Sequence, residues 1–486
     1  MRAAEEAAFG RGIEVEALMD QAGAGVARAV RQFFPDPGEC IVYAGKGHNG
    51  GDALVAAERL QRKGWKISDV RLPFPESDCS ELTRKKLAVL REGPKAPPAA
   101  EGNVGRTIIL DGLLGVGTKS FLREPIRATA RELNRLRVER NAYVFAVDLP
   151  TGFNSDTGEI DPDSVVADFT ATIGFAKHAL VGDAAIDFAG RIVILPLFDL
   201  EVGGARNEIM ATTQALAGLI PRRKFGAYKN QFGRIGVVAG SKGFVGAALM
   251  TVRGALRSGA GLVELFVPEE IYEIAAAAVP AEVMVKTTRA YRDLPDERIS
   301  IWAVGPGLGN AHGGRIMDLI ARVERPMVID ADALNILAGE IDVLKRCRGP
   351  RLLTPHPGEM QRLFASGKMT RAGIARSFCE QFPVTLLLKG SRTVVAQRDR
   401  PLSFNCTGNP GMAKGGMGDV LTGVCAGLIG QGLSLYDAAR IGAWLCGRSA
   451  EIAISQAGAT ELTLLPSDVL DNLARALVEL ELGSTL

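Results

Sequence analysis

The sequence of 486 residues is 47% hydrophobic and contains 57 glycines, a composition that is typical of compact α/β proteins and excludes a disordered chain. Its 57 basic and 55 acidic residues leave a net charge of +2, so we expect no general attraction to nucleic acid or to an anionic membrane. No apolar run approaches the roughly 18 residues of a membrane span, and the first residues lack an apolar segment. We therefore predict a cytoplasmic protein, and the length favours two or three domains.

The first predicted elements surround a glycine-rich loop. A short buried strand over 40–45 leads into it, an amphipathic helix follows, and residues 45–50 match the G-x-G-x-x-G spacing of dinucleotide-binding folds. Asp52, at the predicted start of the helix, would repel a pyrophosphate bound there. The next strand, near 68–74, ends in prolines, with only Glu76 beyond it as a ribose-binding acid. These two details disfavour a redox-cofactor site.

Strand-like and helix-like segments then alternate through both halves of the chain. The first half continues with strands over 107–115 and 143–152 and a helix near 124–140, and residues 199–213 read as a linker without apolar periodicity. Continuous apolar strands separated by helices imply a parallel sheet that is covered on both faces. The second half repeats this pattern, with strands over 233–241, 261–268, 300–309, 326–335, 351–355, 384–391 and 393–397.

The seven cysteines form no C-x-x-C pair, and their odd number leaves one thiol over in any disulfide scheme. We predict that they are buried, reduced thiols.

Polar side chains follow three successive strands of the first half. In an open parallel sheet such strand ends share one crevice, in which ligands bind. A lone aspartate there is more often a helix cap or a loop hydrogen bond, whereas three in succession favour a common site. Oxygen donors without paired Cys or His ligands suggest a hard cation and leave one carboxylate for proton transfer. The residues are His48, Asn49 and Asp52, then Asp111, then Asp148 and Thr151.

Five motifs of the first half, in this order and spacing, together resemble the NAD(P)HX epimerase domain, also called the YjeF N-terminal domain. The resemblance implies a Rossmann-like three-layer αβα domain over residues 1–203 that binds a hydrated nicotinamide nucleotide and K⁺. The motifs are "LMDQAG" (18–23), "GKGHNGGDALVAA" (45–57), "LDGLLGVGT" (110–118), "EPI" (124–126) and "VDLPTGFNSDTGEI" (147–160).

The resemblance also implies residue roles. Asn49, Asp111 and Thr151 would hold K⁺, and Asp148 would be the catalytic acid or base. His48, Ala53 and Thr151 stand where the family usually has Asn, Gly and Ser. The implied substrate contacts are His48, Asn49, Gly50, Gly51, Asp52, Gly115, Val116, Gly117, Thr118, Lys119, Ser120 and Phe121.

Glycines 415, 416 and 418 lead into a predicted helix that begins near Asp419. Several backbone N–H groups would point outward at the positive end of this helix and form an anion hole. A carboxylate directly after it is placed to take a proton from an attacking hydroxyl group while the N–H groups stabilise a phosphoryl group. Taken alone, the stretch is explained equally well as a glycine-rich turn that Asp419 caps.

Five further motifs decide between these interpretations, because with this one they resemble ADP-dependent NAD(P)H-hydrate dehydratase. The resemblance implies a ribokinase-like αβα domain over residues 213–486. The motifs are "AGSKGFVGAA" (239–248), "VGPGLG" (304–309), "VIDADALN" (328–335), "LLTPHPGEM" (352–360) and "LLLKGSRTVVA" (386–396).

By this resemblance Asp419 would be the catalytic base. Lys414 and Met417 stand where relatives have Thr, and Lys414 would either add a cation near the phosphates or point to water. Cys446, where relatives often have His, would be a structural thiol. Ala247, Gly309 and His356 would line the hydrated nicotinamide site, and Lys389, Gly390, Ser391, Arg392, Thr393, Gly415, Gly416 and Gly418 the adenine nucleotide site.

Together the two resemblances imply a bifunctional metabolite repair enzyme, an isomerase and a lyase. It would epimerise the R and S hydrates of NADH and NADPH and dehydrate the S form at the expense of ADP, with Mg²⁺ and K⁺ as metal ions. We expect these small molecules as partners, a homo-oligomer, and neither nucleic acid nor membrane. Two other functions remain open, an ATP-dependent small-molecule kinase and a non-catalytic nucleotide-binding scaffold.

Overall fold

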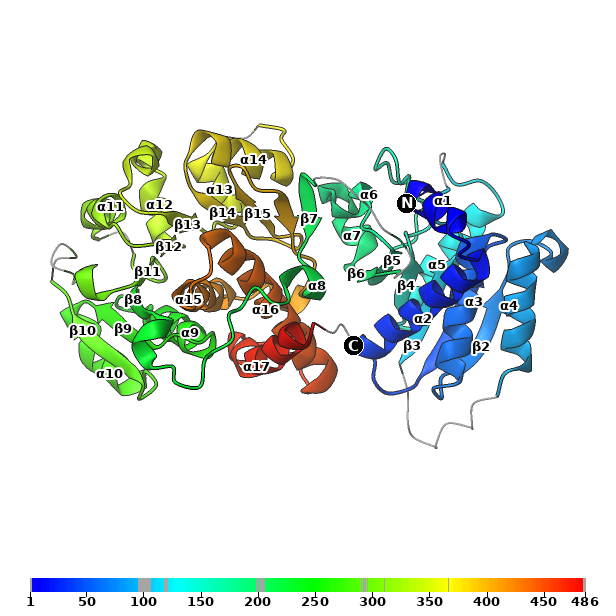
Figure 1. The fold of residues 1–486 in the computed structure, drawn as a ribbon, viewed down its shortest axis with the longest axis horizontal. Helices are drawn as coiled ribbons and strands as arrows, with labels where there is room; N and C mark the ends of the chain where they lie inside the picture. The colour runs from blue at the N-terminus through cyan, green and yellow to red at the C-terminus, as the bar shows by residue number, and fades with distance from the viewer. Residues whose placement is uncertain are drawn as a thin grey trace. The chain divides into compact units, whose positions relative to one another are not determined.

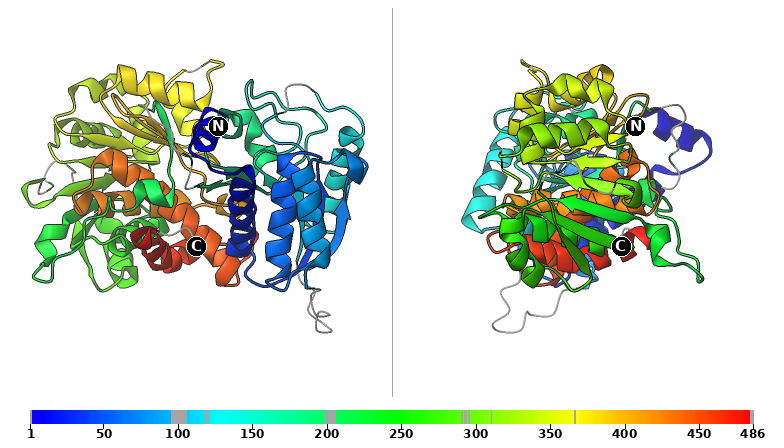
Figure 2. Two further views of the ribbon diagram at one scale, coloured as in Figure 1. Left: turned by 45° about the vertical axis from the view of Figure 1, so that its right-hand side comes forward. Right: turned by 90° about the vertical axis from the view of Figure 1, so that its left-hand side faces the viewer.

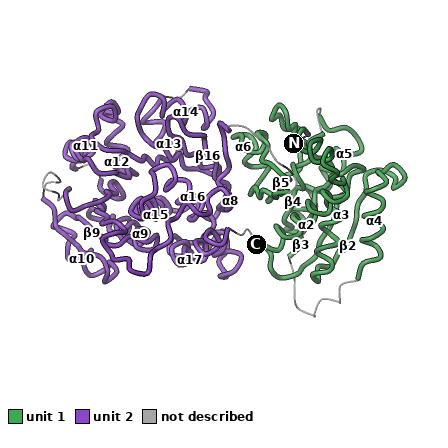
Figure 3. The backbone as a smooth tube through the Cα atoms, in the orientation of Figure 1, with its two compact units in different colours: residues 1–205, 486 green, residues 206–485 purple. Residues whose placement is uncertain are grey.

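The computed structural model describes residues 2–94, 106–117, 121–197, 200, 206–289, 291, 294, 296–309, 311–365 and 367–483. The chain divides into two compact units (Figure 3). The first unit comprises Met1–Ala205 with Leu486, and the second unit comprises Arg206–Thr485. No helix among the described residues is both long and apolar enough to cross a membrane.

The described part of the first unit holds one parallel sheet in the order β2-β1-β3-β4-β5-β6 (Figure 1). Its strands are β1 (Glu39–Ala44), β2 (Lys66–Arg71), β3 (Thr107–Gly112), β4 (Tyr143–Val147), β5 (Phe169–Ile173) and β6 (Arg191–Leu195). Its helices are α1 (Arg2–Gly10), α2 (Val15–Phe33), α3 (His48–Gln61), α4 (Glu81–Glu92), α5 (Ile126–Glu139), α6 (His178–Val181) and α7 (Ile186–Ala189).

Both faces of this sheet are covered, as the continuous apolar strands predict. Along β1 successive side chains point to opposite faces: Val42 packs in the core beneath α2 and α3, and Tyr43 in the core beneath α5. Helices α2, α3 and α4 lie side by side, drawn in shades of blue (Figure 2). The carboxyl ends of the strands therefore remain the place where polar side chains can gather.

The described part of the second unit holds a ten-stranded sheet in the order β10-β9-β8-β11-β12-β13-β14-β15-β16-β7, in which β15 is antiparallel to both of its neighbours. The strands are β7 (Glu208–Met210), β8 (Arg234–Val238), β9 (Leu262–Val267), β10 (Val283–Thr287), β11 (Ile301–Val304), β12 (Met327–Ile329), β13 (Arg351–Leu353), β14 (Thr385–Leu388), β15 (Val394–Gln397) and β16 (Leu402–Phe404). The helices are α8 (Thr213–Leu216), α9 (Val245–Arg257), α10 (Tyr272–Ala278), α11 (Gly313–Arg322), α12 (Asp332–Leu337), α13 (Pro357–Leu363), α14 (Arg371–Gln381), α15 (Met417–Gly430), α16 (Leu435–Gln456) and α17 (Pro466–Leu482).

The predicted linker over 199–213 is wrong in part, because β7 lies within it. This strand pairs in parallel with β16 through Glu208 and Leu402, and Ala211 N–H donates to Phe404 O at 2.8 Å. Three residues are too few to show strand periodicity, and pairing with a strand almost 200 residues further along the chain creates β7. The second unit thus begins ahead of residue 213.

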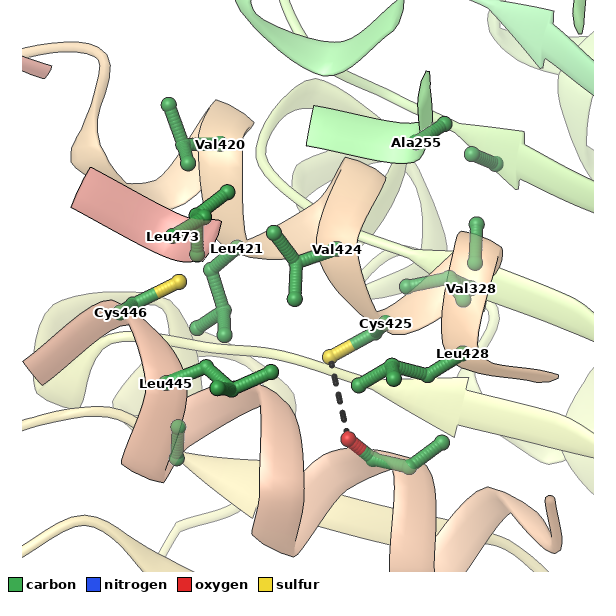
Figure 4. Close-up of a cluster of buried hydrophobic side chains, with 14 of the residues drawn as sticks. Ala255, Val328, Val420, Leu421, Val424, Cys425, Leu428, Leu445, Cys446 and Leu473 are labelled. Carbon is green, nitrogen blue, oxygen red and sulfur yellow. Dashed lines mark hydrogen bonds between the residues drawn. The ribbon is translucent and has the colours of Figure 1, made fainter. Parts of the chain in front are cut away.

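Glycines allow α9 and α15 to touch backbone to backbone. A Cβ on Gly254 of α9 would lie 2.5 Å from Val420 O, and one on Gly423 of α15 would overlap Thr251 O. Around this contact Val420, Val424 and Leu428 pack with side chains of α9, α16 and α17 in one apolar cluster (Figure 4). The close approach fixes where the first turn of α15 lies.

The cysteines are free thiols, and the prediction that they are buried is confirmed for all of them except Cys347, which is half-buried. Cys425 and Cys446 belong to the same apolar cluster, in which Cys425 Sγ lies 3.9 Å from Ala438 O (Figure 4). Burial raises the pKa of the Cys446 thiol to about 12 and that of the Cys425 thiol well above its usual value, so both stay neutral. Cys425 and Cys446 therefore contribute to the packing of the apolar cluster.

We predict that Gly423→Ala lowers the stability of the second unit by at least about 2 kcal/mol, since the added methyl group meets backbone rather than a movable side chain. Thermal unfolding followed by circular dichroism measures the effect. Gly314→Ala is the matched control, because Gly314 is an exposed helical glycine whose Cβ would meet nothing within 4 Å. Equal melting temperatures for the two variants would contradict the glycine contact.

Candidate active sites

The first candidate site begins where β1 runs into α3. The helix starts at His48, with Gly47 as its N-cap, so the predicted start near Asp52 is wrong by one turn. Gly50 and Gly51 face inward: a Cβ on Gly50 would overlap Gly45 O, and one on Gly51 would lie 2.5 Å from the Met19 side chain. Tight packing, which the apolar pattern does not show, extends the helix through this glycine-rich stretch.

Asp111, at the end of β3, is fully buried and is held by neutral groups. Thr151 donates to it through Oγ1 at 2.7 Å and through its backbone N–H at 2.8 Å, and Leu113 N–H donates at 3.3 Å. Burial raises the pKa of Asp111 to about 6, although these hydrogen bonds act to lower it. The described residues that hydrogen-bond to Asp111 carry no positive charge, so they do not neutralise its carboxylate.

Asn49 lies against the loop that follows Asp111. A Cβ on Gly115 would lie 3.1 Å from Asn49 Oδ1, and Asn49 Nδ2 is buried without a hydrogen-bond partner. Leu114 N–H donates to Thr151 Oγ1 at 3.1 Å, which ties the same loop to Thr151. The structure thus brings Asn49, Asp111 and Thr151 around one loop, and this set of oxygens has the donor chemistry of a hard monovalent cation.

Asp148 follows β4 with a φ of 67° and is buried. Its Oδ1 accepts from Ile173 N–H at 2.9 Å and from the Lys177 ammonium, while no described residue donates to Oδ2. Lys177 also donates to Ile173 O at 2.8 Å and to Thr172 Oγ1 at 3.0 Å, and its side chain is only 9% exposed. This buried lysine, bound to the candidate catalytic acid, is a candidate functional residue that the sequence analysis did not identify.

Asp52 completes the polar side of this site. It is 8% exposed, and its pKa is raised well above the usual range by burial and, next, by the charge of Asp148. The site therefore contains two carboxyl groups in different environments: Asp148 is paired with a cation, whereas Asp52 favours its neutral form.

The remaining predicted contacts of the first site lie on the loop after β3. Gly117 has open space around it, Val116 O accepts from Ser155 Oγ at 3.3 Å, and Phe121 is 62% exposed. Thr118, Lys119 and Ser120 lie outside the described residues.

The second candidate site lies at the start of α15. The helix begins at Met417 after Gly416, whose φ of 95° is the left-handed conformation that favours glycine, so Asp419 stands in the first turn close to the predicted position. Burial, together with the charges of Asp330 and Asp332, raises the pKa of Asp419 to about 6, although the charge of Lys389 acts to lower it. A carboxylate with this pKa can serve as a proton acceptor near neutral pH.

Lys389 is placed beside this helix start. Its Nζ donates to Asp330 Oδ1 at 2.7 Å, and a Cβ on Gly418 would lie 3.2 Å from the same nitrogen. The remaining residues of the predicted nucleotide motif form the turn between β14 and β15, in which Thr393 Oγ1 donates to Gly390 O at 2.9 Å, Arg392 is buried and Ser391 is exposed.

Two loops place the residues that were predicted for the hydrated nicotinamide. Ser241 Oγ donates to Gly307 O at 2.8 Å, and a Cβ on Gly307 would lie 3.0 Å from the Cβ of Ala247. Gly309 N–H donates to Asp332 Oδ2 at 2.8 Å. Because Asp332 also acts on the pKa of Asp419, the Gly309 loop lies near the candidate base.

His356 joins the same edge from α13. Its Nδ1 accepts from Gly358 N–H at 3.0 Å, and its backbone N–H donates to Glu359 Oε2 at 2.8 Å. The same Glu359 oxygen lies 3.9 Å from Lys389 Nζ. Capping thus fixes the His356 ring, whose side chain stays 52% exposed.

Comparison with known proteins identifies the family. The family described as YjeF-related protein N-terminus matches residues 15–179, and that described as NAD(P)H-hydrate dehydratase matches residues 235–475. The bifunctional NAD(P)H-hydrate repair enzyme of Moorella thermoacetica is 34% identical over 497 residues, which cover 96% of this chain and 92% of that protein. The chain belongs to this family. The Escherichia coli member is 31% identical over 492 residues, covering 98% of this chain and 92% of its own length.

Solved structures bear out the predicted fold of the second unit. An ADP/ATP-dependent NAD(P)H-hydrate dehydratase from Bacillus subtilis, co-crystallised with ATP/Mg²⁺, matches with a TM-score of 0.50 and 29% identity, covering 57% of this chain and all of that one. A ribokinase-like superfamily protein from Enterococcus faecalis matches with a TM-score of 0.50 and 25% identity, covering 58% and 99%. The α/β fold class and the ribokinase-like second unit are therefore confirmed, as is the parallel sheet of the first.

At three positions this chain has a residue other than the one that is usual in the hydrate repair family, and the structure shows the surroundings of each. Lys414 Nζ donates to Leu462 O at 2.7 Å. Met417 packs against the apolar cluster of the second unit. His48 is exposed at the start of α3, where its imidazole is open to a ligand.

Proposed function

We propose that the chain repairs hydrated NADH and NADPH in two steps. The first unit interconverts the R and S epimers at Asp148, and the second unit dehydrates the S form with ADP as phosphoryl donor. The observation that carries this proposal is the union of both families in one chain with a candidate acid or base at each site, Asp148 beside Lys177 and Asp419 beside the amide groups of α15. A dehydratase that accepts one epimer leaves the other unused, and the fused epimerase returns it.

In the dehydration step Asp419 takes the proton of the substrate hydroxyl group. The hydroxyl oxygen then bonds to the terminal phosphorus of ADP as the bond to AMP breaks, and the N–H groups of Gly416, Met417 and Gly418 stabilise the charge on the phosphoryl oxygens. Phosphate leaves with the C–O bond electrons while a neighbouring C–H proton is lost, which restores the ring double bond. The products are NADH or NADPH, AMP and phosphate. Magnesium would enter with the nucleotide phosphates and neutralise part of their charge.

In the epimerisation step the hydroxyl group leaves one face of the ring and returns to the other. A neutral Asp52 is suited to protonate the leaving oxygen, and Asp148, oriented by Lys177, is suited to take a proton from the returning water. Asn49, Asp111 and Thr151 would hold potassium, and their fit rests on the buried Asp111, to which the described residues supply only neutral donors. The ion, when bound, would supply that missing positive charge.

The assay that tests the whole proposal is incubation with a mixed hydrate preparation and either ADP or ATP, followed at the absorbance of the reduced nicotinamide. Complete return of the absorbance with ADP supports repair of both epimers. A stable phosphorylated product made with ATP, without return of the absorbance, would establish a small-molecule kinase instead. The homo-oligomer and the cytoplasmic location stay predictions.

We predict that Asp419→Ala lowers dehydration of the S hydrate by about 10²- to 10⁴-fold, the usual contribution of a general base, and leaves epimerisation unchanged. Chromatography of the two epimers measures both rates. Asp342→Ala, at an aspartate whose side chain is 76% exposed, is the control. Equal loss of both activities would refute the division of labour between the units.

Dehydration by the unaltered chain should decline as the pH falls through about 6. The raised pKa of Asp419 means that its ionised form, the proton acceptor, is depleted there, whereas an ordinary aspartate stays ionised down to about pH 4. The measurement is kcat/KM for the S hydrate between about pH 5 and 8. A flat profile would show that Asp419 is not the base.

Asp148→Ala and Lys177→Met should each leave the R hydrate unconverted while the S hydrate is still consumed. Asp148→Ala removes the proton acceptor, and Lys177→Met removes the ammonium group that orients it. Loss of one such group costs about 10²-fold or more. Lys66→Met, at an exposed lysine of β2, is the control for the loss of a positive charge. R consumption faster than spontaneous epimerisation in either variant would count against that residue.

A further inference from the structure

Two buried side chains and one half-buried lysine at the start of α15 form a network that the proposed dehydration does not use. Asp330 follows β12, Lys389 follows β14, and Thr422 lies one turn after Gly418 on α15. Lys389 donates to one oxygen of Asp330 at 2.7 Å, and Thr422 Oγ1 donates to the other at 2.8 Å. The network thus joins two strand ends to the helix that carries Asp419.

Asp330 is the fixed centre of this network. It is 1% exposed, and a carboxylate so deeply buried is costly unless it is paired and hydrogen-bonded. Its backbone N–H donates to Val304 O at 3.1 Å, so that its position follows from the sheet itself. With both oxygens engaged, Asp330 has one orientation, and that orientation sets where the ammonium group of Lys389 lies.

Lys389 is the one member of the network that reaches the surface, with a side chain that is 19% exposed. Burial acts to lower its pKa, but the charges of Asp330 and Glu359 outweigh burial and raise it, so the ammonium group stays charged. A Cβ on Gly418 would lie 3.2 Å from Nζ, which places the charge directly beside the first turn of α15. An ammonium group carries three donors and therefore keeps bonding capacity beyond Asp330 and Glu359.

We propose that Asp330 and Thr422 are positioning residues, which hold the Lys389 ammonium group against the start of α15 so that it contacts the phosphoryl group that ADP transfers. The inference rests on the proposed dehydration and deepens it. A lysine is a flexible point charge that loses rotamer freedom when it is fixed, and a buried partner that fixes it in advance reduces this cost on binding. In this assignment Lys389 contacts the transferred phosphoryl group of ADP and not its adenosine part.

The decisive measurement compares the affinities of the full chain for ADP and for AMP, which lacks the transferred group, by calorimetry without hydrate. Lys389→Met should weaken ADP binding by about 10- to 100-fold, the worth of a charged hydrogen bond, and leave AMP binding unchanged. Equal losses for ADP and AMP, or no loss for either, would overturn the assignment. Because no turnover is needed, failure of the dehydration assay and failure of this proposal are separate results.

The positioning role is tested by Thr422→Val, with Thr422→Ser as the variant that keeps the hydroxyl group. We expect Thr422→Val to weaken ADP but not AMP binding by about 3- to 10-fold and Thr422→Ser to restore it. Thr385→Val is the matched control, since Thr385 is also buried and also donates one side-chain hydrogen bond, to Gln397 at 2.7 Å, at the far end of β14. A Thr422→Val variant that binds like Thr385→Val would refute the positioning role.

The pH profile of dehydration supplies a readout that a merely structural role would not move. The charged groups that act on Asp419 are Asp330, Asp332 and Lys389. Removal of the negative charge in Asp330→Asn should move the acid limb of kcat/KM to lower pH, and removal of the positive charge in Lys389→Met should move it to higher pH. Shifts in one common direction, or none in folded variants, would contradict the network.

Discussion

A buried carboxylate must be neutralised, paired or hydrogen-bonded, and this requirement organises both units. Asp148 is paired with Lys177, and Asp330 with Lys389. Lys177 follows β5, the neighbour of β4, and Lys389 follows β14, which β13 separates from β12, so each pair meets at the carboxyl ends of parallel strands in its own sheet. The anions are thereby held in single orientations before any ligand arrives, which is the condition for electrostatic preorganisation.

The second site depends equally on the packing beneath it. Because α9 and α15 touch through Gly254 and Gly423, the first turn of α15 is held at a fixed distance from the sheet. Thr422 stands next to that contact and binds Asp330, while Asp419 lies three residues before it, in the half-buried first turn of the helix. The apolar contact and the polar network therefore restrain the same turn of α15. A substitution that alters the helix contact is expected to disturb the hydrogen bonds of the network as well.

The sequence predicted both sheets, the main strands and the first turn of α15, because long apolar runs and glycine-rich turns report local structure. It did not predict β7 or β16, three-residue strands that are defined by their pairing with each other and, for β16, with β15. Lys177 was missed for a related reason: a lone lysine in a sequence reads as a solvated side chain, and only the order of strands shows that it meets Asp148. Strand pairing joins residues that are far apart in the chain, so the local pattern of a single sequence does not predict it.

Strand β7 has a consequence for how the second unit can be handled by itself. It is the outermost strand of the larger sheet and satisfies backbone groups of β16. A fragment cut at residue 213 would leave those N–H and C=O groups without their neighbour, and bare strand edges invite association with other chains. Solubility of an isolated second unit therefore depends on three residues that carry no catalytic group.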